Sequence, residues 1–431
     1  MNKISGLLIY KGSQIEKQNM MWNMLGSFCY AFASMVLSFC VMRISGEEAG
    51  GVFAIGYSAF GQQMFTLAYF GLRPFQITDR GAQQEGYSFG EYRRHRRLTA
   101  AMAVITSALF SAWMGGIGAY GKEKALAVFF LALYKIIDGY ADVYESEFQR
   151  QGSLYLTGKS NTFRTLLSVA VFLFTLAAAQ NLVFASAAAA AAQILGMVLC
   201  DVSVIGALPR VEYSCREKST SKLFSQTGLL FLSVFLDFYI FSAAKYAIDG
   251  QLNDAASGYF NLIFMPTSVI YLVANFVIRP FLVRMTVCWN QGDKKGLKRI
   301  LKKIGGIIMG LTVLAVSGCL VLGRLVLSVM EYLLGNGYEG CLTGYLAPFT
   351  VIVAGGGVYA MANLMYYCLV IMRQQKVIFL VYAVTAVAAL ILAPALVAKL
   401  EIFGAALAYC LFMAMQFLGF GLQTAFALRR G

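Results

Sequence analysis

Histidine, proline and charged residues are scarce in this chain, and each shortage excludes a class of protein. The one histidine among 431 residues is His95, which the sequence places in a loop among arginines, so no catalytic or metal site built on histidine is expected. The nine cysteines are scattered without a C-x-x-C spacing, which argues against a metal site or a disulfide framework. A phosphate-binding Gly-Lys-Ser/Thr loop and a nucleophile–base constellation are both missing. We therefore expect a protein that is not an enzyme, holds no cofactor and does not itself hydrolyse ATP.

Charged residues make up 13% of the chain and hydrophobic residues 59%, whereas about 25% of a soluble domain is charged. Apolar runs of about twenty residues recur along the whole length, each long enough to cross a hydrocarbon core of about 30 Å. These features predict an all-α integral membrane protein whose twelve transmembrane helices form two six-helix bundles. The predicted spans are residues 20–42, 50–72, 98–119, 125–147, 162–180, 182–206, 223–247, 257–281, 304–330, 342–370, 376–397 and 401–427.

Basic residues collect in every second loop, while the loops between them are short and several are acidic. By the positive-inside rule, the basic loops and both termini are expected in the cytoplasm. The net charge of +14 then reflects orientation in the membrane and not nucleic-acid binding. The basic loop residues are Arg93, Arg94, Arg96, Arg97, Arg150, Lys159, Arg164, Arg210, Arg216, Lys218, Lys222, Lys294, Lys295, Lys298, Arg299, Lys302, Lys303, Arg373 and Lys376.

Two of the six prolines lie in one repeated frame, F-x-x-R-P-F. It spans Phe70–Phe75 and again Phe276–Phe281, about half a chain apart, which predicts two similar halves. We expect a pseudo-two-fold axis along the membrane normal, with Arg73 and Arg279 facing each other near the cytoplasmic side. The alternative is that both arginines extend to the lipid headgroups. The predicted domains are an interfacial segment at 1–19, a first bundle at 20–207, a cytoplasmic linker at 208–222 and a second bundle at 223–431.

The fourth predicted span carries charges at helical spacing. Lys135, Asp138, Asp142 and Glu145 are three, four and three residues apart, which places them on one stripe of a helix. Because a charge near the bilayer centre costs at least about 2.5 kcal/mol, the stripe should face protein or water. Lys135 and Asp138 are close enough in sequence to pair. Two interpretations stay open: an ion-pair network inside the first bundle, or the wall of a hydrated cavity.

The seventh predicted span carries Asp237 near its middle and Lys245 eight residues later on the same face. Asp237 is expected at the same depth as Lys135, so the two are either paired across a central cleft or paired separately within their own halves. In the tenth span, the run Gly355–Gly357 follows Pro348 and predicts a bend or an unwound turn.

Several loose motifs follow one another along the chain. They are Asn23 and Gly26, Asp142 with Gln149-Arg150, Tyr246-x-Ile248, Gly258-Tyr259-Phe260 with Pro266, Ile278-Arg279-Pro280, and Leu334-Gly335-Asn336-Gly337-Tyr338. In this order they resemble the bacterial polysaccharide flippases, which export O-antigen and capsule units. That family belongs to the superfamily that also holds the multidrug and toxic compound extruders and the lipid II flippases.

The resemblance implies two six-helix bundles around a V-shaped lumen in the bacterial cytoplasmic membrane. It also implies movement of an undecaprenyl-pyrophosphate-linked oligosaccharide to the outer leaflet, with a polysaccharide polymerase and glycosyltransferases as further partners. Twelve spans are two fewer than expected of lipid II flippases. Proton or sodium coupling is left open. A pyrophosphate needs cations, and the predicted substrate-binding residues are Arg279, Arg73, Lys135, Asp138, Asp142, Asp237 and Lys245.

Three other classes are alternatives. A multidrug or cation antiporter of the same superfamily would want an acidic lumen, and Asp237 keeps that alternative open although the first span has no Asp or Glu. A major-facilitator sugar porter would carry a longer loop motif, of which Asp79-Arg80-Gly81 is only a fragment. A membrane-embedded glycosyltransferase or polymerase would need a long extracytoplasmic loop with catalytic acids, and every predicted outer loop is short.

Overall fold

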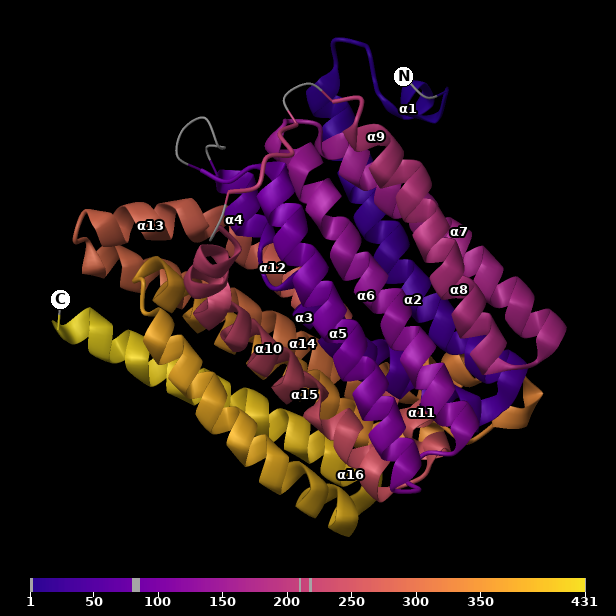
Figure 1. Ribbon diagram of the computed structural model, residues 1–431. Coiled ribbons are helices and arrows are strands. Elements are labelled where there is room, and N and C mark those ends of the chain that lie inside the picture. Colours follow the sequence, from indigo (N-terminus) through magenta and orange to yellow (C-terminus); the bar gives the residue numbers. More distant parts are fainter. Residues whose placement is uncertain (1–2, 80–85, 209–210, 217–218, 431) are drawn as a thin grey trace. The chain divides into compact units, whose positions relative to one another are not determined.

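The computed structural model describes residues 3–79, 86–208, 211–216 and 219–430, and the regular structure in these ranges is helical (Figure 1). Arg80, Gly81, Arg210 and Lys218, which the sequence assigns to loops, lie outside the described residues. The chain divides into two compact units, Met1–Phe235 and Leu236–Gly431. The division falls inside one long helix, α10 (Ser219–Gln251). The predicted bundle boundaries at 207 and 223 therefore stay predictions.

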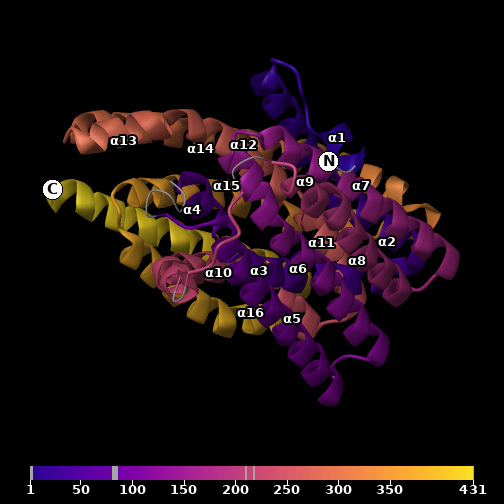
Figure 2. The same cartoon turned by 45° about the horizontal axis from the view of Figure 1, so that its top comes forward.

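The first unit is a set of long helices arranged around α6. In this unit α6 contacts α3, α5, α7 and α8, and α2 lies along α7 (Figures 1 and 2). Its elements before α10 are α1 (Lys3–Leu8), α2 (Ile15–Phe53), the π-helix η1 (Ala54–Ala59), α3 (Phe60–Tyr69), α4 (Arg73–Thr78), α5 (Phe89–Gly116), α6 (Lys122–Arg150), α7 (Leu154–Ala179), α8 (Leu182–Met197), the π-helix η3 (Val198–Val202) and α9 (Ser203–Ile205).

The second unit is built around α15, which contacts α11, α12, α14 and α16. The long α16 is interrupted at Glu401, where φ is +51°. Besides the end of α10, the elements are α11 (Asp254–Phe264), α12 (Pro266–Ile278), the 3₁₀ turn η4 (Arg279–Phe281), α13 (Leu282–Asn290), α14 (Lys294–Leu334), the 3₁₀ turns η5 (Asn336–Tyr338) and η6 (Thr343–Tyr345), α15 (Leu346–Ile371) and α16 (Gln375–Arg430).

Among the described residues, nine helical segments are long and apolar enough to cross a membrane. Two of them contain a single long helix that is interrupted by a residue with non-helical backbone angles, Gly46 in α2 and Glu401 in α16. The charged helix α6 is not among the nine. The chain is thus a multi-pass membrane protein, and its division into twelve spans and two six-helix bundles remains a prediction.

The two F-x-x-R-P-F segments differ in backbone conformation. Phe70 ends α3 in the left-handed region with φ of +52°, and Gly71 follows with φ of +65°, so α4 starts afresh at Arg73. In the second copy, by contrast, Arg279–Phe281 form a 3₁₀ turn that joins α12 to α13 without leaving helical angles. Glycine tolerates a positive φ at no steric cost, and Gly71 supplies this freedom in the first copy only, where the second has Val277-Ile278. The predicted superposition of the two copies stays a prediction.

The predicted loop around His95 is a helix. A capping box starts α5: the Ser88 hydroxyl accepts from the Glu91 amide, and the Glu91 carboxylate accepts from the Ser88 amide. Arg93–Arg97 therefore lie about one to two turns inside α5, and His95 is fully buried, with its ring centroid 4.1 Å from that of Phe224. The prediction of a loop was wrong because α5 begins at Phe89, well before the apolar span predicted at 98–119.

A short extended segment before α10 is fastened to the start of α5. The Gly90 amide donates to the Glu212 carbonyl oxygen at 3.0 Å, and Arg216 Nε donates to Glu91 Oε1 at 3.0 Å. Hydrogen bonding to Glu91 holds the pKa of Arg216 above its ordinary value, so this guanidinium stays charged at any physiological pH. The described part of the predicted linker, 211–216, is therefore attached to the first unit.

Of the predicted bend or unwound turn at Gly355–Gly357, the unwound turn is wrong, since α15 is a continuous helix through these three residues, and the bend stays a prediction. The glycines serve packing instead. A Cβ on Gly355 would lie 2.9 Å from the Tyr409 ring of α16, and a Cβ on Gly356 would lie 3.0 Å from Ile270 of α12. The missing side chains allow neighbouring helices to approach α15 closely, as small residues do in membrane helix packing.

Candidate functional site

Asp142 of α6 is the centre of a buried polar network in the first unit. Its Oδ1 accepts from Arg73 Nη1 at 2.7 Å, and its Oδ2 accepts from Arg96 Nη2 at 2.6 Å. Arg73 comes from the start of α4 and also donates to Gln149 Oε1 at 3.1 Å. Arg96 of α5 is fully buried, and its guanidinium lies 4.7 Å from the Tyr69 ring centroid. Three helices thus meet at one carboxylate.

A second arginine cluster continues the network one turn along α6. Arg164 of α7 donates to Asp138 Oδ1 at 2.6 Å, to Glu145 Oε1 at 2.8 Å and to Asp201 Oδ2 at 2.9 Å. Asp201 lies in η3, and both Arg164 and Asp201 are at most 1% exposed. Arg73 Nη1 also lies 3.4 Å from Glu145 Oε2, which joins the two clusters.

The network as a whole pairs three arginines with four carboxylates inside the first unit. Only Arg73 is appreciably exposed, at 26% of its side chain. Buried charges persist when each is paired and hydrogen-bonded, because an unpaired buried charge is strongly destabilising. Arg73 is therefore held by acids of its own unit and does not extend to lipid headgroups. Asp138 and Asp142 lie in the interior, as the helical spacing predicted, while their part in substrate binding stays a prediction.

Lys135 lies at the edge of this network and takes part in none of its ion pairs. Its Nζ donates to the Tyr30 hydroxyl at 3.0 Å and lies 3.8 Å from the Tyr57 ring centroid. A cation over an aromatic face gains roughly 0.5–2 kcal/mol, depending on desolvation. Within the described residues Lys135 and Asp138 form no direct ion pair, because Asp138 accepts from Arg164 and from Gln193 Nε2 at 3.3 Å. The two charges still attract each other through space, as their spacing predicted. Pairing of Lys135 with Asp237 stays a prediction.

In the second unit, Asp237 of α10 is surrounded by tyrosines and an amide. Its carboxylate accepts from the Tyr359 hydroxyl at 3.2 Å and from Gln416 Nε2 at 3.3 Å. Tyr359 in turn stacks on Tyr271, with ring centroids 5.6 Å apart. Within the described residues, no lysine or arginine forms an ion pair with Asp237. This half-buried carboxylate therefore has hydrogen-bond donors but no balancing cation in the part of the chain that the structure describes.

Lys245 shares a helix with Asp237 but not a partner. Its Nζ donates to Asn261 Oδ1 of α11 at 2.9 Å and lies 5.0 Å from the Phe264 ring centroid. Lys245 is 8% exposed, so its ammonium is held by α11 and is not open to a ligand in this arrangement.

Arg279 differs from every other charged residue predicted for the site. Its side chain is exposed at the junction of α12 and η4, and within the described residues it forms no hydrogen bond or ion pair. Arg73 in the matching motif is committed to Asp142 and Glu145. As far as the described residues go, Arg279 is the one of these two arginines whose donors are free for a ligand.

Sequence reasoning missed three members of the network: Arg96, Arg164 and Asp201. Arg96 and Arg164 were counted as loop charges, because a basic residue just past an apolar run usually marks a cytoplasmic loop. The burial of Arg96 and Arg164 could have been predicted from Asp138, Asp142 and Glu145 in a neighbouring span, since buried acids require buried cations. Among the described residues, no group of three or more His, Cys, Asp or Glu side chains is arranged to hold a metal ion.

The fold is shared with known transporters. No protein-family model and no curated protein matches this sequence. A MATE family multidrug resistance transporter of the MOP superfamily, inward-facing, matches with a TM-score of 0.68 at 12% identity, over 96% of this chain and 98% of its own. The lipid II flippase MurJ, inward closed, matches with a TM-score of 0.67 at 13% identity, over 94% of this chain and 87% of its own. The eukaryotic MATE transporter AtDTX14 matches with a TM-score of 0.61 at 14% identity, over 97% and 99%.

At these identities the likeness establishes the fold. This chain is a multi-pass membrane protein with the fold of MATE transporters and of the lipid II flippase MurJ. The structural neighbours named here are transporters or flippases and not enzymes. The polysaccharide flippase family, which the sequence motifs resemble, is one candidate within that fold.

Proposed function

We propose that this protein is a flippase that moves an undecaprenyl-pyrophosphate-linked oligosaccharide from the inner to the outer leaflet of the bacterial cytoplasmic membrane. The observation that carries the proposal is Arg279, an exposed guanidinium without a partner in the described residues, on a segment apolar enough to cross the membrane. A guanidinium matches two phosphate oxygens with parallel hydrogen bonds and stays charged at any relevant pH. The pyrophosphate of a lipid-linked oligosaccharide is an anion of that kind.

The proposal gives different roles to the two F-x-x-R-P-F arginines. Arg279 binds the pyrophosphate as the headgroup enters from the inner leaflet. Arg73 holds α4 to α6 through Asp142 and Glu145. Lys135, Asp138 and Asp142 then support the first unit, and Asp237 and Lys245 have their own partners in the second. An anion moving outward is favoured by an inside-negative potential, by about 2.3 kcal/mol per charge at 100 mV. Proton or sodium coupling is therefore not required.

The proposed architecture keeps twelve spans in two six-helix bundles. Counting each side of Gly46 and of Glu401 as a separate span, and adding the charged helix α6, raises the nine segments to twelve. Helix α6 carries too many charged residues to count among the nine segments. Charged side chains inside a membrane helix face protein, and those of α6 are paired there. Both termini are cytoplasmic in this arrangement. Glycosyltransferases act before transport, and a polymerase acts after it.

A multidrug or cation antiporter is the second candidate, and Asp237 is the observation that favours it. A carboxylate without a balancing cation, next to the stacked rings of Tyr271 and Tyr359, suits an organic cation by charge and by cation–π attraction. The shared fold of MATE transporters and MurJ supports both candidates alike. We prefer the flippase because of the unpartnered Arg279 and the order of the sequence motifs.

Replacing Arg279 tests the proposed function. In a flippase-deficient strain complemented with this chain, Arg279→Ala is expected to lower surface polysaccharide at least tenfold, because it removes a charge-assisted hydrogen-bond pair worth about 1.5–3 kcal/mol. Arg279→Lys keeps the positive charge but loses the paired donors of the planar guanidinium, and it is expected to retain part of the export. The matched control is Arg284→Ala, an exposed arginine five residues further on, which should leave export unchanged.

Membrane protein levels are measured for each variant by immunoblot, so that lost protein is not counted as lost transport. Full export by a normally expressed Arg279→Ala protein would contradict the proposed role of Arg279. Equal losses in Arg279→Ala and Arg284→Ala would assign both residues to general membrane anchoring.

A further inference from the structure

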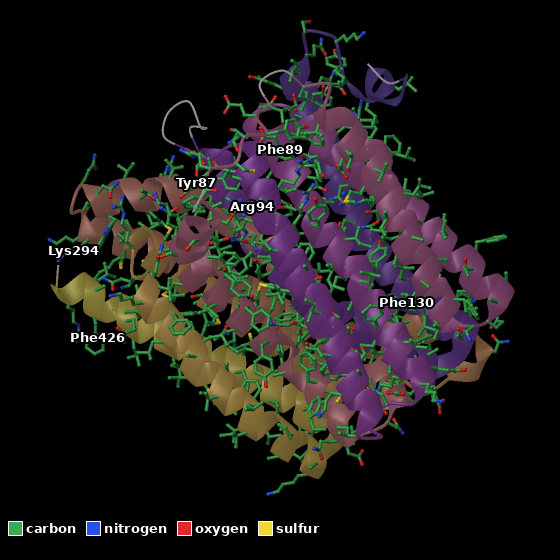
Figure 3. All side chains as sticks on the ribbon, viewed as in Figure 1. Tyr87, Phe89, Arg94, Phe130, Lys294 and Phe426 are labelled. Carbon is green, nitrogen blue, oxygen red and sulfur yellow. The ribbon has the colours of Figure 1, made fainter. Side chains whose placement is uncertain are left out.

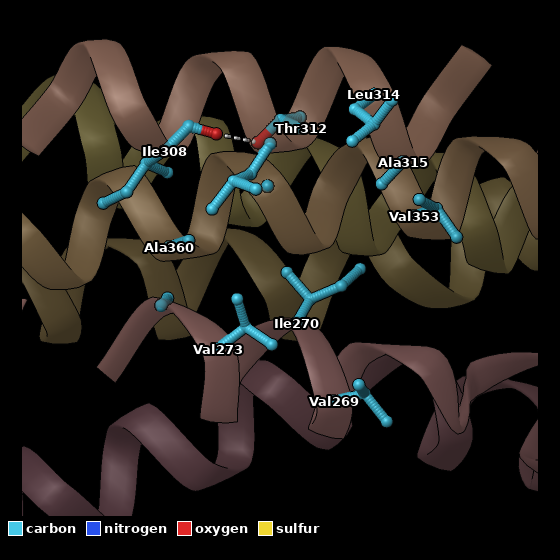
Figure 4. A pocket seen from close by; sticks show the side chains of 12 residues that line it. Val269, Ile270, Val273, Ile308, Thr312, Leu314, Ala315, Val353 and Ala360 are labelled. Atoms are coloured by element: carbon cyan, nitrogen blue, oxygen red, sulfur yellow. Dashed lines mark hydrogen bonds between the residues drawn. The ribbon is translucent and has the colours of Figure 1, made fainter. Parts of the chain in front are cut away.

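An apolar groove runs between α12, α14 and α15 inside the second unit. Its volume is about 300 Å³, and Figure 4 shows the side chains that line it. Ile308, Val273 and Ala360 lie toward one end, and Leu314, Val269 and Val353 toward the other. The function proposed above makes no use of this groove.

The groove offers nothing polar to a ligand. Thr312 is its one hydroxyl, and Thr312 Oγ1 donates to the Ile308 carbonyl oxygen of its own helix at 2.8 Å (Figure 4). A sugar, an ion or a water molecule in the groove would lose hydrogen bonds without replacement. A hydrocarbon chain loses none and gains apolar contact. The occupant that fits this lining is therefore an apolar chain.

Small residues line the groove where α14 and α15 meet. Gly357 of α15 lies directly against Thr312 of α14, since a Cβ on Gly357 would run into the Thr312 side chain. Ala360 lies toward the Ile308 end of the groove and Ala315 toward the Val353 end, and neither fills it with a long side chain (Figure 4). The lining on α14 runs from Ile308 to Ala315, about two helical turns, which suits an elongated and flexible occupant.

One end of the groove carries a positive charge. Lys303 precedes the groove residue Ile308 by five positions on α14, about 7.5 Å along the helix. Its Nζ lies 5.8 Å from the Phe281 ring centroid, in the turn that follows α12. Lys303 is exposed, and within the described residues no carboxylate forms an ion pair with it. An anionic group at this end of an occupant would meet an unpaired cation.

We propose that the groove binds the chain of a single-chain lipid phosphate, a polyprenyl phosphate, with the phosphate toward Lys303. A polyprenyl phosphate has one hydrocarbon chain per phosphate, and the protein offers one groove with a cation at one end. A diacyl phospholipid has two chains per phosphate and would leave one of them outside the groove. This inference rests on the proposed function, since it gives the carrier chain of the transported lipid a binding site within the second unit.

Photo-crosslinking on the purified full-length protein tests the inference. The probe is a polyprenyl phosphate with a diazirine in its chain, and the crosslinked peptides are identified by mass spectrometry. Crosslinks are expected on the groove residues of α12, α14 and α15. Ala315→Phe fills the groove and is expected to lower crosslinking about tenfold, because about two buried methylenes lose their contacts. Val313→Phe, on an exposed position of the same helix outside the lining, should change nothing.

Two further comparisons separate the charge and the lipid class. Lys303→Ala is expected to lower crosslinking of the polyprenyl phosphate but not of the uncharged polyprenol. Excess phosphatidylglycerol should not compete. If Ala315→Phe does not accumulate, Val273→Trp replaces it, with Leu272→Trp as its control, since both positions are exposed and only Val273 lines the groove.

Equal crosslinking in the filled and control variants, or full competition by phosphatidylglycerol, would overturn the inference and make the groove a site of bulk lipid. The export assay with Arg279→Ala is read independently. If the groove is crosslinked in a protein that supports no export, lipid binding in the groove is upheld and the proposed flippase function is contradicted. If the protein supports export but is crosslinked only outside the groove, the flippase function is upheld and lipid binding in the groove is contradicted.

Discussion

Arg94 and Arg96 are two residues apart on α5 and have opposite surroundings. Arg94 is exposed near the start of the helix, where Figure 3 labels it with Tyr87 and Phe89. Arg96 is fully buried, pairs with Asp142 and donates to the Ala68 carbonyl oxygen at 3.4 Å and to that of Tyr69. The same side chain is thus a solvated charge at one position and part of the core at the other.

Arg96→Met is expected to destabilise the protein by about 3 kcal/mol, because it leaves Asp142 with a single cation in a buried site. Arg94→Met is the matched control and should change stability by less than about 0.5 kcal/mol. The measurement is the thermal unfolding midpoint of the purified proteins in one detergent. Similar midpoints for the two variants would show that the buried ion pair at Arg96 contributes little.

For individual residues, the sequence predicted the acidic members of the buried network but not their arginine partners. The spacing of Asp138, Asp142 and Glu145 was enough to place them on one buried stripe. Their partners Arg96 and Arg164 could not be assigned, because a single sequence does not say how far a helix continues past its apolar run. Asp201 carried no local signal at all, since its partner lies 37 residues earlier in the chain.

Among the elements, α15 shows how glycine spacing acts in a membrane helix. Gly355 lies against Tyr409 and the Cα of Cys410, while Gly306 on α14 faces open space. The three consecutive glycines predicted a bend or an unwound turn. The helix is instead continuous, and its glycines allow α12, α14 and α16 to approach it closely.

Gly355→Ala is therefore expected to destabilise the second unit by about 1–3 kcal/mol, as overpacking does, since the added Cβ would lie 2.9 Å from the Tyr409 ring. Gly306→Ala adds the same methyl group in open space and is expected to be neutral or to stabilise α14 by up to about 1 kcal/mol. Unfolding midpoints of the two single variants compare the positions directly. A Gly355→Ala protein as stable as Gly306→Ala would contradict close packing at α15.

For the whole molecule, composition and hydropathy were enough to predict an all-helical membrane protein, and the shared fold of MATE transporters and MurJ agrees. The positions of most spans follow from apolar runs, which the bilayer requires of any crossing helix. The F-x-x-R-P-F repeat predicted that Arg73 and Arg279 face each other, and both were predicted to bind substrate. Arg73 is instead paired with Asp142 and Glu145, whereas Arg279 forms no ion pair within the described residues. A repeat in sequence does not determine side-chain pairing, which depends on acids elsewhere in each unit.

Transport of a lipid-linked oligosaccharide by the purified protein tests the central claim most directly. The protein is reconstituted into liposomes that carry a fluorescent undecaprenyl-pyrophosphate oligosaccharide, and a glycosidase added outside reports glycans that reach the outer leaflet. We expect the accessible fraction to rise with protein dose, Arg279→Ala to slow the rise about tenfold, and ethidium not to be exchanged for protons or sodium. An unchanged accessible fraction together with ion-driven ethidium transport that depends on Asp237 would contradict the flippase and establish the cation antiporter.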